Sequence, residues 1–295
     1  MKLAKIVKDC RIDKPRHFKL ADHDPAECFG VSTDIEDVRP ILADGIAKLE
    51  ELQQRLYAHG QWALLIVLQG MDAAGKDGVV KHVMSGVNPE GCDVHSFKAP
   101  SVEELGHDFL WRIEKALPER GHIGIFNRSH YEEVLIVRVH PDMLKAQNLP
   151  AAATGKNIWR HRFKDIRAFE RRLSRNGTLI LKFHLRISKD EQRKRFLARL
   201  DEPAKRWKFS KNDIAERAFW DKYMSAYEDM IRETSTDDAP WYVVPADHKH
   251  IAWLVVSTAI IEALEGLKLA YPKVTGQALK ELKASARALK ADEES

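Results

Sequence analysis

A glycine-rich loop that ends in a lysine carries the clearest chemical signal in this chain. Residues 67–80 read VLQGMDAAGKDGVV, in which the glycines and lysine have the G-x-x-x-x-G-K spacing of a phosphate-binding loop. Glycines let backbone N–H groups point inward at phosphate oxygens, and the helix that follows adds positive charge at its start. We predict that phosphates bind at Gly70, Ala73, Ala74, Gly75 and Lys76, with Lys81 further along the same helix. The alternative is a plain glycine turn with a solvated lysine.

Two acidic residues depart from the usual form of such a loop. Asp72 lies inside it, and Asp77 stands where a Ser or Thr ordinarily holds magnesium. A bare carboxylate repels phosphate, whereas a carboxylate bound to a divalent cation attracts it because the ion bridges the two anions. We therefore predict that Asp72 is a ligand of Mg²⁺, with Mn²⁺ as the alternative ion. For Asp77, a catalytic role and a simple helix-start role, favoured by the helix dipole, are both kept.

A second polar group follows another apolar segment, in the stretch HIGIFNRSHYEEV. Ligands of parallel sheets bind outside the carboxyl ends of the strands, so Asn127, Arg128 and Glu132 are candidate site residues. Arg128 has the geometry to clamp a phosphate, Asn127 offers a neutral oxygen, and Glu132 is suited to a metal or to the acceptor. Turn capping and a surface ion pair are the alternative for Asn127 and Arg128. His130 is predicted to be structural.

A strongly basic segment lies between residues 186 and 217. It contains eleven Lys or Arg and six Asp or Glu, an excess of five positive charges that exceeds the +4 of the whole chain. Arg195 and Arg199 are four residues apart and so share one helix face. A charged helix is often only a solvated surface. The segment follows an apolar run at residues 178–187, however, and phosphate-loop kinases carry an arginine-bearing lid after the corresponding strand. We predict a basic lid long enough for an extended polyanion.

The elements that position these residues alternate between strands and helices. Apolar runs predict strands over residues 62–69, 92–97, 122–129, 178–187 and 239–247. Helical periodicity and capping signals predict helices over residues 37–60, from residue 75 onward, and over 101–118, 155–177, 189–235 and 250–269. The helix over 101–118 begins with a Ser101–Glu104 capping box, and the segment 189–235 is broken at Pro203. This alternation predicts an α/β fold with a parallel sheet.

Composition restricts the class of protein. The chain has 295 residues, of which 44% are hydrophobic and 31% charged, and three cysteines in no metal-binding pattern. The cysteines favour a reducing, cytoplasmic setting, and no apolar run is long enough to span a bilayer. We expect an irregular N-terminal arm over residues 1–34, a main domain over 35–272 and a solvated C-terminal tail over 273–295.

Four stretches together resemble the polyphosphate kinase 2 family: GMDAAGKDG, IGIFNRSHYEEV, SKDEQRKRFLARLDEPAKRWKFS and APWYVVPADHKH. The resemblance covers roughly residues 35–269 and keeps the family's order and spacing. It implies a P-loop kinase-like three-layer α/β sandwich, with a parallel sheet and a helical lid at about 189–235. It also implies that the terminal phosphate of inorganic polyphosphate is moved to a nucleotide, with Mg²⁺.

The same resemblance implies roles for individual residues. It implies that Asp72 and Asn127 hold magnesium, although many members carry Asp at the position of Asn127. The implied catalytic residues are Asp72, Lys76, Arg128 and Arg195, the implied phosphate ligands of the lid are Arg195, Arg199, Lys205 and Lys208, and the implied nucleotide-binding residues are Lys98, Asn127, Arg128 and Glu132. Glu132 occupies the position tied to nucleotide monophosphates, which indicates the subgroup that accepts both AMP and ADP.

The mechanism expected from these residues is in-line phosphoryl transfer, with AMP, ADP and ATP, or guanine nucleotides, as partners of polyphosphate. An ATP-dependent kinase is one rival, and a non-catalytic sensor of nucleotide or polyphosphate is another. Nucleic acid is not an expected partner, because no aromatic platform accompanies the basic segment. No membrane association is expected, and the resemblance implies a homodimer or homotetramer.

Overall fold

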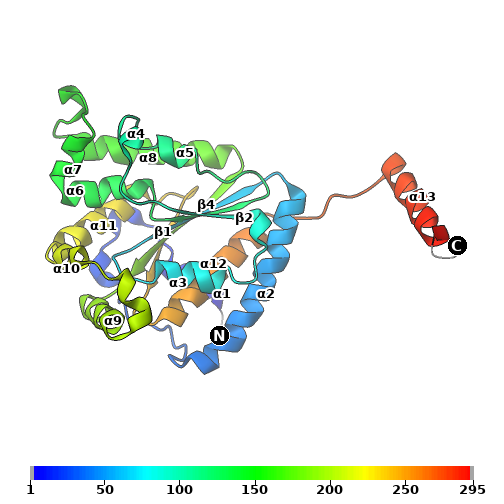
Figure 1. Ribbon diagram of the computed structural model, residues 1–295, viewed down its shortest axis with the longest axis horizontal. Coiled ribbons are helices and arrows are strands. Elements are labelled where there is room, and N and C mark those ends of the chain that lie inside the picture. The colour runs from blue at the N-terminus through cyan, green and yellow to red at the C-terminus, as the bar shows by residue number, and fades with distance from the viewer. Residues whose placement is uncertain (1–2, 293–295) are drawn as a thin grey trace.

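The computed structural model describes residues 3–292 and is built around one five-stranded parallel sheet (Figure 1). The strand order is β2-β3-β1-β4-β5. The strands are β1 (Ala63–Gln69), β2 (Cys92–Ser96), β3 (Ile123–Asn127), β4 (Thr178–Arg186) and β5 (Trp241–Pro245). The predicted α/β fold with a parallel sheet is confirmed, and all five strands lie where the apolar runs indicate.

Strand β1 lies at the centre of the sheet and is buried along its whole length. Its continuous apolar sequence is what a parallel strand covered on both faces requires. Leu68 lies opposite Asn127 of β3, and Gln69 lies opposite His184 of β4. This register brings the carboxyl ends of three strands to one edge, where the phosphate loop begins.

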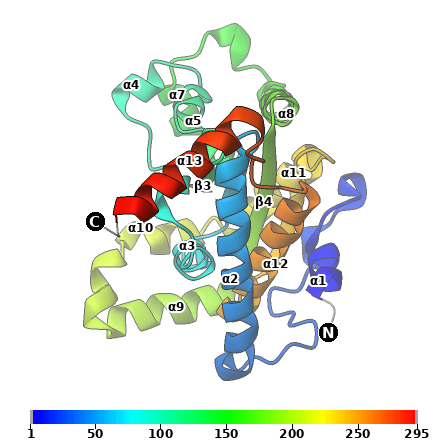
Figure 2. The ribbon, with the colours of Figure 1, turned by 90° about the vertical axis from the view of Figure 1, so that its right-hand side faces the viewer.

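Helices cover both faces of the sheet (Figure 1). One layer contains α2 (Ile35–His59), α3 (Lys76–Val83) and α12 (Lys249–Gly266), and Figure 2 shows α2 lying alongside α12. The other contains α6 (Ile136–Val139), α8 (Ile158–Arg175) and α11 (Trp220–Thr234). The sheet and its two helical layers form the predicted three-layer sandwich.

The predicted lid is a helical excursion between β4 and α11. It consists of α9 (Lys189–Asp201), a 3-10 segment (Pro203–Lys208) and α10 (Lys211–Arg217). Ser188 caps α9 by accepting from the N–H of Glu191 at 3.0 Å. The break at Pro203 is confirmed, and Ser210 begins a further helix by accepting from the N–H of Asn212 at 3.2 Å.

The expectation of an irregular N-terminal arm is wrong at its start. Residues Leu3–Cys10 form helix α1, whose Ile6, Val7 and Cys10 are buried and pack towards α12. Ile12 continues along the edge of the sheet, where its N–H donates to Trp241 O at 2.9 Å. Eight residues are too few to show helical periodicity in the sequence, so only packing identifies this helix.

The single helix expected over residues 101–118 is also wrong. Two short helices replace it, α4 (Val102–Leu105) and α5 (Trp111–Glu114). The Ser101–Glu104 capping box is confirmed, but the helix ends at Gly106. The Asp108 carboxylate then accepts from the N–H of Leu110 at 2.7 Å and starts a new turn. A further short helix, α7 (Pro141–Ala146), follows α6.

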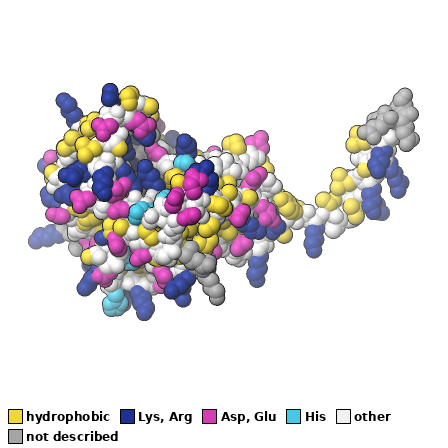
Figure 3. All heavy atoms as spheres, turned by 90° about the horizontal axis from the view of Figure 1, so that it is seen from below, with side chains coloured by type: hydrophobic (Ala, Val, Ile, Leu, Met, Phe, Trp, Pro, Cys, Tyr) yellow, Lys and Arg dark blue, Asp and Glu magenta, His cyan; other side chains and the backbone are white. Residues whose placement is uncertain are grey.

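The C-terminal helix α13 (Gly276–Asp292) projects away from the rest of the molecule (Figure 1). Figure 3 shows basic and hydrophobic side chains along this arm, clear of the main body. All its described side chains are exposed, which fits the predicted solvated helix. Among residues 3–292 there is no helix with the length and apolar character needed to cross a bilayer.

We propose that the folding unit ends near residue 272. Deleting residues 273–295 is expected to change Tm by less than about 2 °C, because α13 buries no side chain. Deleting residues 1–12 is the matched control and is expected to lower Tm by on the order of 10 °C, because it removes Ile6, Val7 and Cys10 from the core. Differential scanning calorimetry measures the Tm of both deletion variants. Equal losses of Tm would contradict a folding unit that ends near residue 272.

Candidate active site

The phosphate loop connects β1 to α3 in a conformation that needs its glycines. Gly70 has φ of 158°, and a Cβ there would lie 2.7 Å from Leu185 O of β4. Gly75 has φ of 107°, and Ala73, at 65°, is also in the left-handed region. The predicted strand–loop–helix context is therefore present, and the loop lies directly against the end of the neighbouring strand.

Lys76 is buried beneath the loop, so it is not the solvated lysine of the alternative interpretation. Its Nζ donates to Gly70 O at 2.7 Å and to Met71 O at 3.2 Å. Burial, together with the charge of Arg128, lowers the pKa of Lys76 to about 8. An anion bound at the loop would favour the charged ammonium and so raise that pKa again.

Arg128 joins the phosphate loop to the end of β3. Its Nη2 donates to Asp72 Oδ1 at 2.5 Å, and its Nη1 donates to Glu132 Oε2 at 3.4 Å. Burial alone would lower the pKa of Arg128, but Glu132 and Asp72 raise it above its usual value, so the guanidinium stays charged. The residue has φ of 62°, a conformation that non-glycine residues adopt mainly where surrounding contacts impose it. Three of the predicted site residues thus meet at one point.

Gln69, which the sequence analysis did not identify, forms a hydrogen bond to the Glu132 carboxylate. It is fully buried as the last residue of β1. With its amide oriented to satisfy both ends, its nitrogen donates to Glu132 Oε1 at 2.9 Å and its oxygen accepts from Ser129 at 3.1 Å. The available signal was a polar residue closing an otherwise apolar strand.

Asn127 and Asp77 face each other across the start of α3. Asn127 Nδ2 donates to Asp77 Oδ1 at 2.8 Å. This contact gives Asp77 a partner in addition to the helix dipole, and it leaves the Asn127 amide oxygen directed elsewhere. Asp77 therefore contacts a predicted site residue, and both of the roles kept for it stay predictions.

The acidic residues present suit a cation that takes few protein ligands. Within residues 3–292 no three His, Cys, Asp or Glu side chains are grouped as a metal cage. Asp72 is partly exposed, with one oxygen on Arg128. A single partly exposed carboxylate matches Mg²⁺, which keeps several waters and binds substrate phosphates. The residues therefore fit a divalent metal that arrives with its phosphate ligands.

Arg195 of the lid lies against the back of the phosphate loop. Its guanidinium donates to the carbonyl oxygens of Ala73 (2.9 Å), Ala74 (3.2 Å), Ala246 (2.6 Å) and Asp247 (2.8 Å). Glu191 accepts from its Nε at 2.9 Å. The predicted phosphate ligand thus connects α9, the loop and the end of β5 in this structure, a geometry that suits positioning of the loop.

The other predicted basic residues occupy three kinds of surroundings. Arg199 lies 3.9 Å from Asp213 of α10, where burial, followed by the charge of Asp72, raises the pKa of Asp213. Lys205 is exposed and pairs with Glu202. The side chain of Lys208 lies outside the described residues. Lys81 and Lys98 are exposed, and no ion pair of either is present in the described part of the chain. The structure therefore pairs Arg199 and Lys205 with acidic residues of the lid itself.

Two further residues near the site were not predicted. Gln192 of α9 donates to Asp72 O at 2.8 Å and accepts from Arg217 at 2.7 Å, which ties the lid to the loop. Tyr227 of α11 is buried, and its pKa is raised by burial and then by the charge of Glu132. Neither residue has a sequence signal, because both contacts join segments far apart in the chain.

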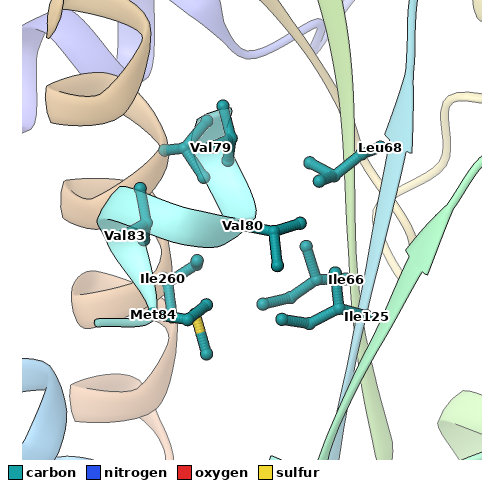
Figure 4. Close-up of a pocket in the computed structure, with 9 residues that line it drawn as sticks. Ile66, Leu68, Val79, Val80, Val83, Met84, Ile125 and Ile260 are labelled. Atoms are coloured by element: carbon teal, nitrogen blue, oxygen red, sulfur yellow. The ribbon is translucent and has the colours of Figure 1, made fainter. Parts of the chain in front are cut away.

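Little space is left between α3 and the sheet. A cavity of about 10 Å³ remains there, lined by Ile66 and Leu68 of β1, and across from them by Val79 and Val83 of α3 and Ile260 of α12 (Figure 4). It is apolar and has room for no more than about one water. A cavity this small, with an apolar lining, does not suit a phosphate group.

The fold and the loop define a P-loop kinase-like protein, and comparisons with known proteins identify its family. The polyphosphate kinase 2 family model matches residues 33–271. The chain is 56% identical over 248 residues to the ADP-polyphosphate phosphotransferase of Rhodopseudomonas palustris, covering 84% of this chain and 86% of the relative. It is 46% identical over 267 residues to the AMP/ADP-polyphosphate phosphotransferase of Meiothermus ruber, covering 90% and 96%.

A solved structure agrees with the sequence comparison. The crystal structure of polyphosphate kinase 2 from Arthrobacter aurescens TC1 superposes with a TM-score of 0.86 at 43% identity, covering 99% of this chain and 97% of that one. The chain therefore belongs to the polyphosphate kinase 2 family, and the resemblance seen in the four sequence stretches is confirmed.

Proposed function

We propose that this protein transfers the terminal phosphoryl group of inorganic polyphosphate to AMP and to ADP, reversibly, giving ADP and ATP. The observation that carries the proposal is the contact between Asp72, inside the phosphate loop, and Arg128 at the end of β3. It supports a site that handles phosphates from two sides, a donor at the loop and an acceptor near Glu132. The relatives named for ADP and for AMP/ADP support the choice of acceptors.

The transfer needs positioning and charge neutralisation more than proton abstraction. The attacking oxygen belongs to the acceptor's terminal phosphate, which is largely anionic near neutral pH, so no strong general base is required. Lys76 and the backbone N–H groups of the loop hold the donor's end phosphate, and Arg128 aligns the acceptor with it. Mg²⁺, with Mn²⁺ as the alternative, would be held by Asp72 and Asn127 and would neutralise phosphate charge when bound. Arg195 keeps the loop in place.

Glu132 and its support by Gln69 give a prediction about acceptor choice. Gln69→Glu places a second carboxylate about as near to Glu132 as the amide nitrogen is now, at 2.9 Å. Repulsion is expected to move Glu132 and to lower kcat/KM for AMP about 10-fold more than kcat/KM for ADP. Gln69→Met is the control, since it removes the hydrogen bond without adding charge. Steady-state kinetics with each acceptor test this; equal losses for AMP and ADP would contradict a selecting role for Glu132.

The donor is tested by supplying polyphosphate alone. Purified protein with Mg²⁺, ADP and long-chain polyphosphate is expected to form ATP, measured by luminescence after removal of contaminating ATP from the reagents. The ATP-dependent kinase predicts phosphoryl transfer from ATP that polyphosphate does not affect. The sensor predicts tight binding of polyphosphate with no ATP formed. Either of these results would overturn the proposal.

We infer a cytoplasmic location and a homo-oligomeric state from the cysteines and from exposed apolar surface. All three cysteines are free, which suits a reducing compartment. Ile41 and Tyr57 expose apolar surface on α2. A homodimer or homotetramer would cover such surfaces, and light scattering coupled to size exclusion measures the mass directly.

A further inference from the structure

A cluster of buried polar groups lies inside the protein, below the edge of the sheet at which the phosphate loop begins. None of the catalytic steps proposed above uses these groups. Lys182 of β4 is fully buried, and its Nζ donates to Glu170 Oε2 (2.6 Å), to the Tyr131 hydroxyl (2.8 Å) and to Thr234 O (2.8 Å). The Tyr131 hydroxyl donates in turn to Glu170 Oε1 at 2.6 Å. All three ammonium protons and both carboxylate oxygens are therefore satisfied.

Such a cluster is an unusual way to fill a core. Burial alone would raise the pKa of Glu170, but Lys182 and His130 lower it. Burial lowers the pKa of Lys182, and the charge of Glu170 opposes that shift. A buried ion pair often contributes no more stability than apolar residues of the same volume would, because desolvating both charges is costly. Most of the other buried side chains of β4 are apolar, among them Ile180 and Phe183, although His184 is buried as well. The pair is better explained by a requirement for defined geometry than by stability.

The geometry that the cluster defines is that of the segment following β3. Tyr131 belongs to a 3-10 turn (His130–Val134) and is fully buried, whereas Arg128 and Glu132 on either side of it face the site. The Tyr131 N–H donates to Ser129 Oγ at 3.2 Å, so the turn is fixed at both ends of this residue. The left-handed backbone of Arg128, at φ of 62°, requires that its neighbours hold it in place.

We propose that Lys182 and Glu170 are positioning residues, which act through the Tyr131 hydroxyl to hold Arg128 and Glu132 in the geometry needed for phosphoryl transfer. The link is direct: Lys182 and Glu170 both bond the one hydroxyl that projects inward from the turn. A shift of the turn by an ångström would move the Arg128 guanidinium away from Asp72, and misplacement of this size is enough to slow catalysis about 10²-fold. The kinetic part of this proposal rests on the proposed function.

Tyr131→Phe is the first test, because it removes only the hydroxyl. We expect kcat with polyphosphate and ADP to fall about 10-fold or more, with KM for ADP changed less than about twofold. Leu181→Ala is the matched control. Leu181 precedes Lys182 on β4 but faces α12, beside Ala259 and Ala263, so its loss destabilises the core without touching the turn. Assayed well below both Tm values, Leu181→Ala is expected to keep its kcat.

The second test separates positioning from stability. Lys182→Met alone removes the cation beside a buried carboxylate and is expected to lower Tm strongly. Lys182→Met combined with Glu170→Leu replaces the pair with apolar side chains and is expected to recover part of that Tm, because the Tyr131 hydroxyl and Thr234 O still lack these partners. The positioning role predicts that kcat of the double variant stays at least about 10-fold below the wild-type value. Wild-type kcat in the double variant, or in Tyr131→Phe, would overturn the proposal.

A readout that does not need activity keeps the two proposals distinguishable. Amide hydrogen exchange is expected to show about 10-fold faster exchange over residues 128–134 in Tyr131→Phe, and no change there in Leu181→Ala. If wild-type protein forms no ATP from polyphosphate, the proposed function fails while this exchange result still decides the structural role. Unchanged exchange over residues 128–134 would contradict the positioning role regardless of activity.

Discussion

Replacing Lys76 with methionine is expected to lower kcat for phosphoryl transfer from polyphosphate about 10³-fold. The ammonium is held beneath the loop by Gly70 O and Met71 O, at the place where a bound donor phosphate needs positive charge. Methionine has nearly the same length and cannot neutralise that phosphate. Because burial already lowers the pKa of Lys76, the charge is costly in the free protein, and Tm is expected to stay unchanged or to rise.

The measurement is steady-state ATP formation together with thermal unfolding of the same preparations. Lys164→Met, at an exposed position on α8, is the control and is expected to leave both quantities near wild type. A Lys76→Met variant that folds normally and retains more than about one tenth of wild-type kcat would show that the loop does not bind the transferred phosphate.

Replacing Asp72 with asparagine is expected to lower kcat about 10²-fold and to raise the Mg²⁺ concentration needed for half-maximal rate. Asparagine keeps the shape but removes the charge that pairs with Arg128 at 2.5 Å and that would hold the metal. Two effects therefore act together: weaker metal binding and a less well oriented Arg128. Excess Mg²⁺ is expected to restore part of the rate, which a purely structural loss would not allow.

Asp77→Asn is the comparison for this variant, since Asp77 lies in the same loop–helix junction and contacts Asn127. It keeps a hydrogen-bonding side chain at the start of α3, so its kcat is expected to fall less than about 10-fold, with an unchanged Mg²⁺ requirement. The reverse order, with Asp77→Asn the more damaging and the more dependent on Mg²⁺, would assign the metal to Asp77 and contradict the role of Asp72.

The phosphate loop could be predicted from the sequence because its signals are local. Gly70, Gly75 and Lys76 have a fixed spacing, and the run before them has the length and the Val/Ile content of a buried strand. The helices over 37–60 and 155–177 were likewise visible from periodicity. Helix α1 and the break at Gly106 were not, because the first is too short to show a period and the second depends on a side-chain cap at Asp108.

The surroundings of individual side chains could be predicted less well than the elements that carry them. The sequence placed Arg195 on a lid face, but its partners are carbonyls of Ala73 and Ala246, which lie far away in the chain. Lys182 did leave a trace, as the one charged residue in the middle of the apolar run TLILKFHL. Such a residue indicates a buried partner, but periodicity does not show that the partners are Glu170 and Tyr131.

The most direct test of the account is the order in which nucleotides appear when the full chain acts on AMP. Protein is incubated with Mg²⁺, long-chain polyphosphate and AMP, without ADP or ATP, and the nucleotides are separated over time. The account predicts that ADP appears first and ATP follows, because one site built from Lys76, Arg128 and Glu132 serves both acceptors. No nucleotide product from AMP, under conditions in which ADP is converted to ATP, would contradict a site that serves both.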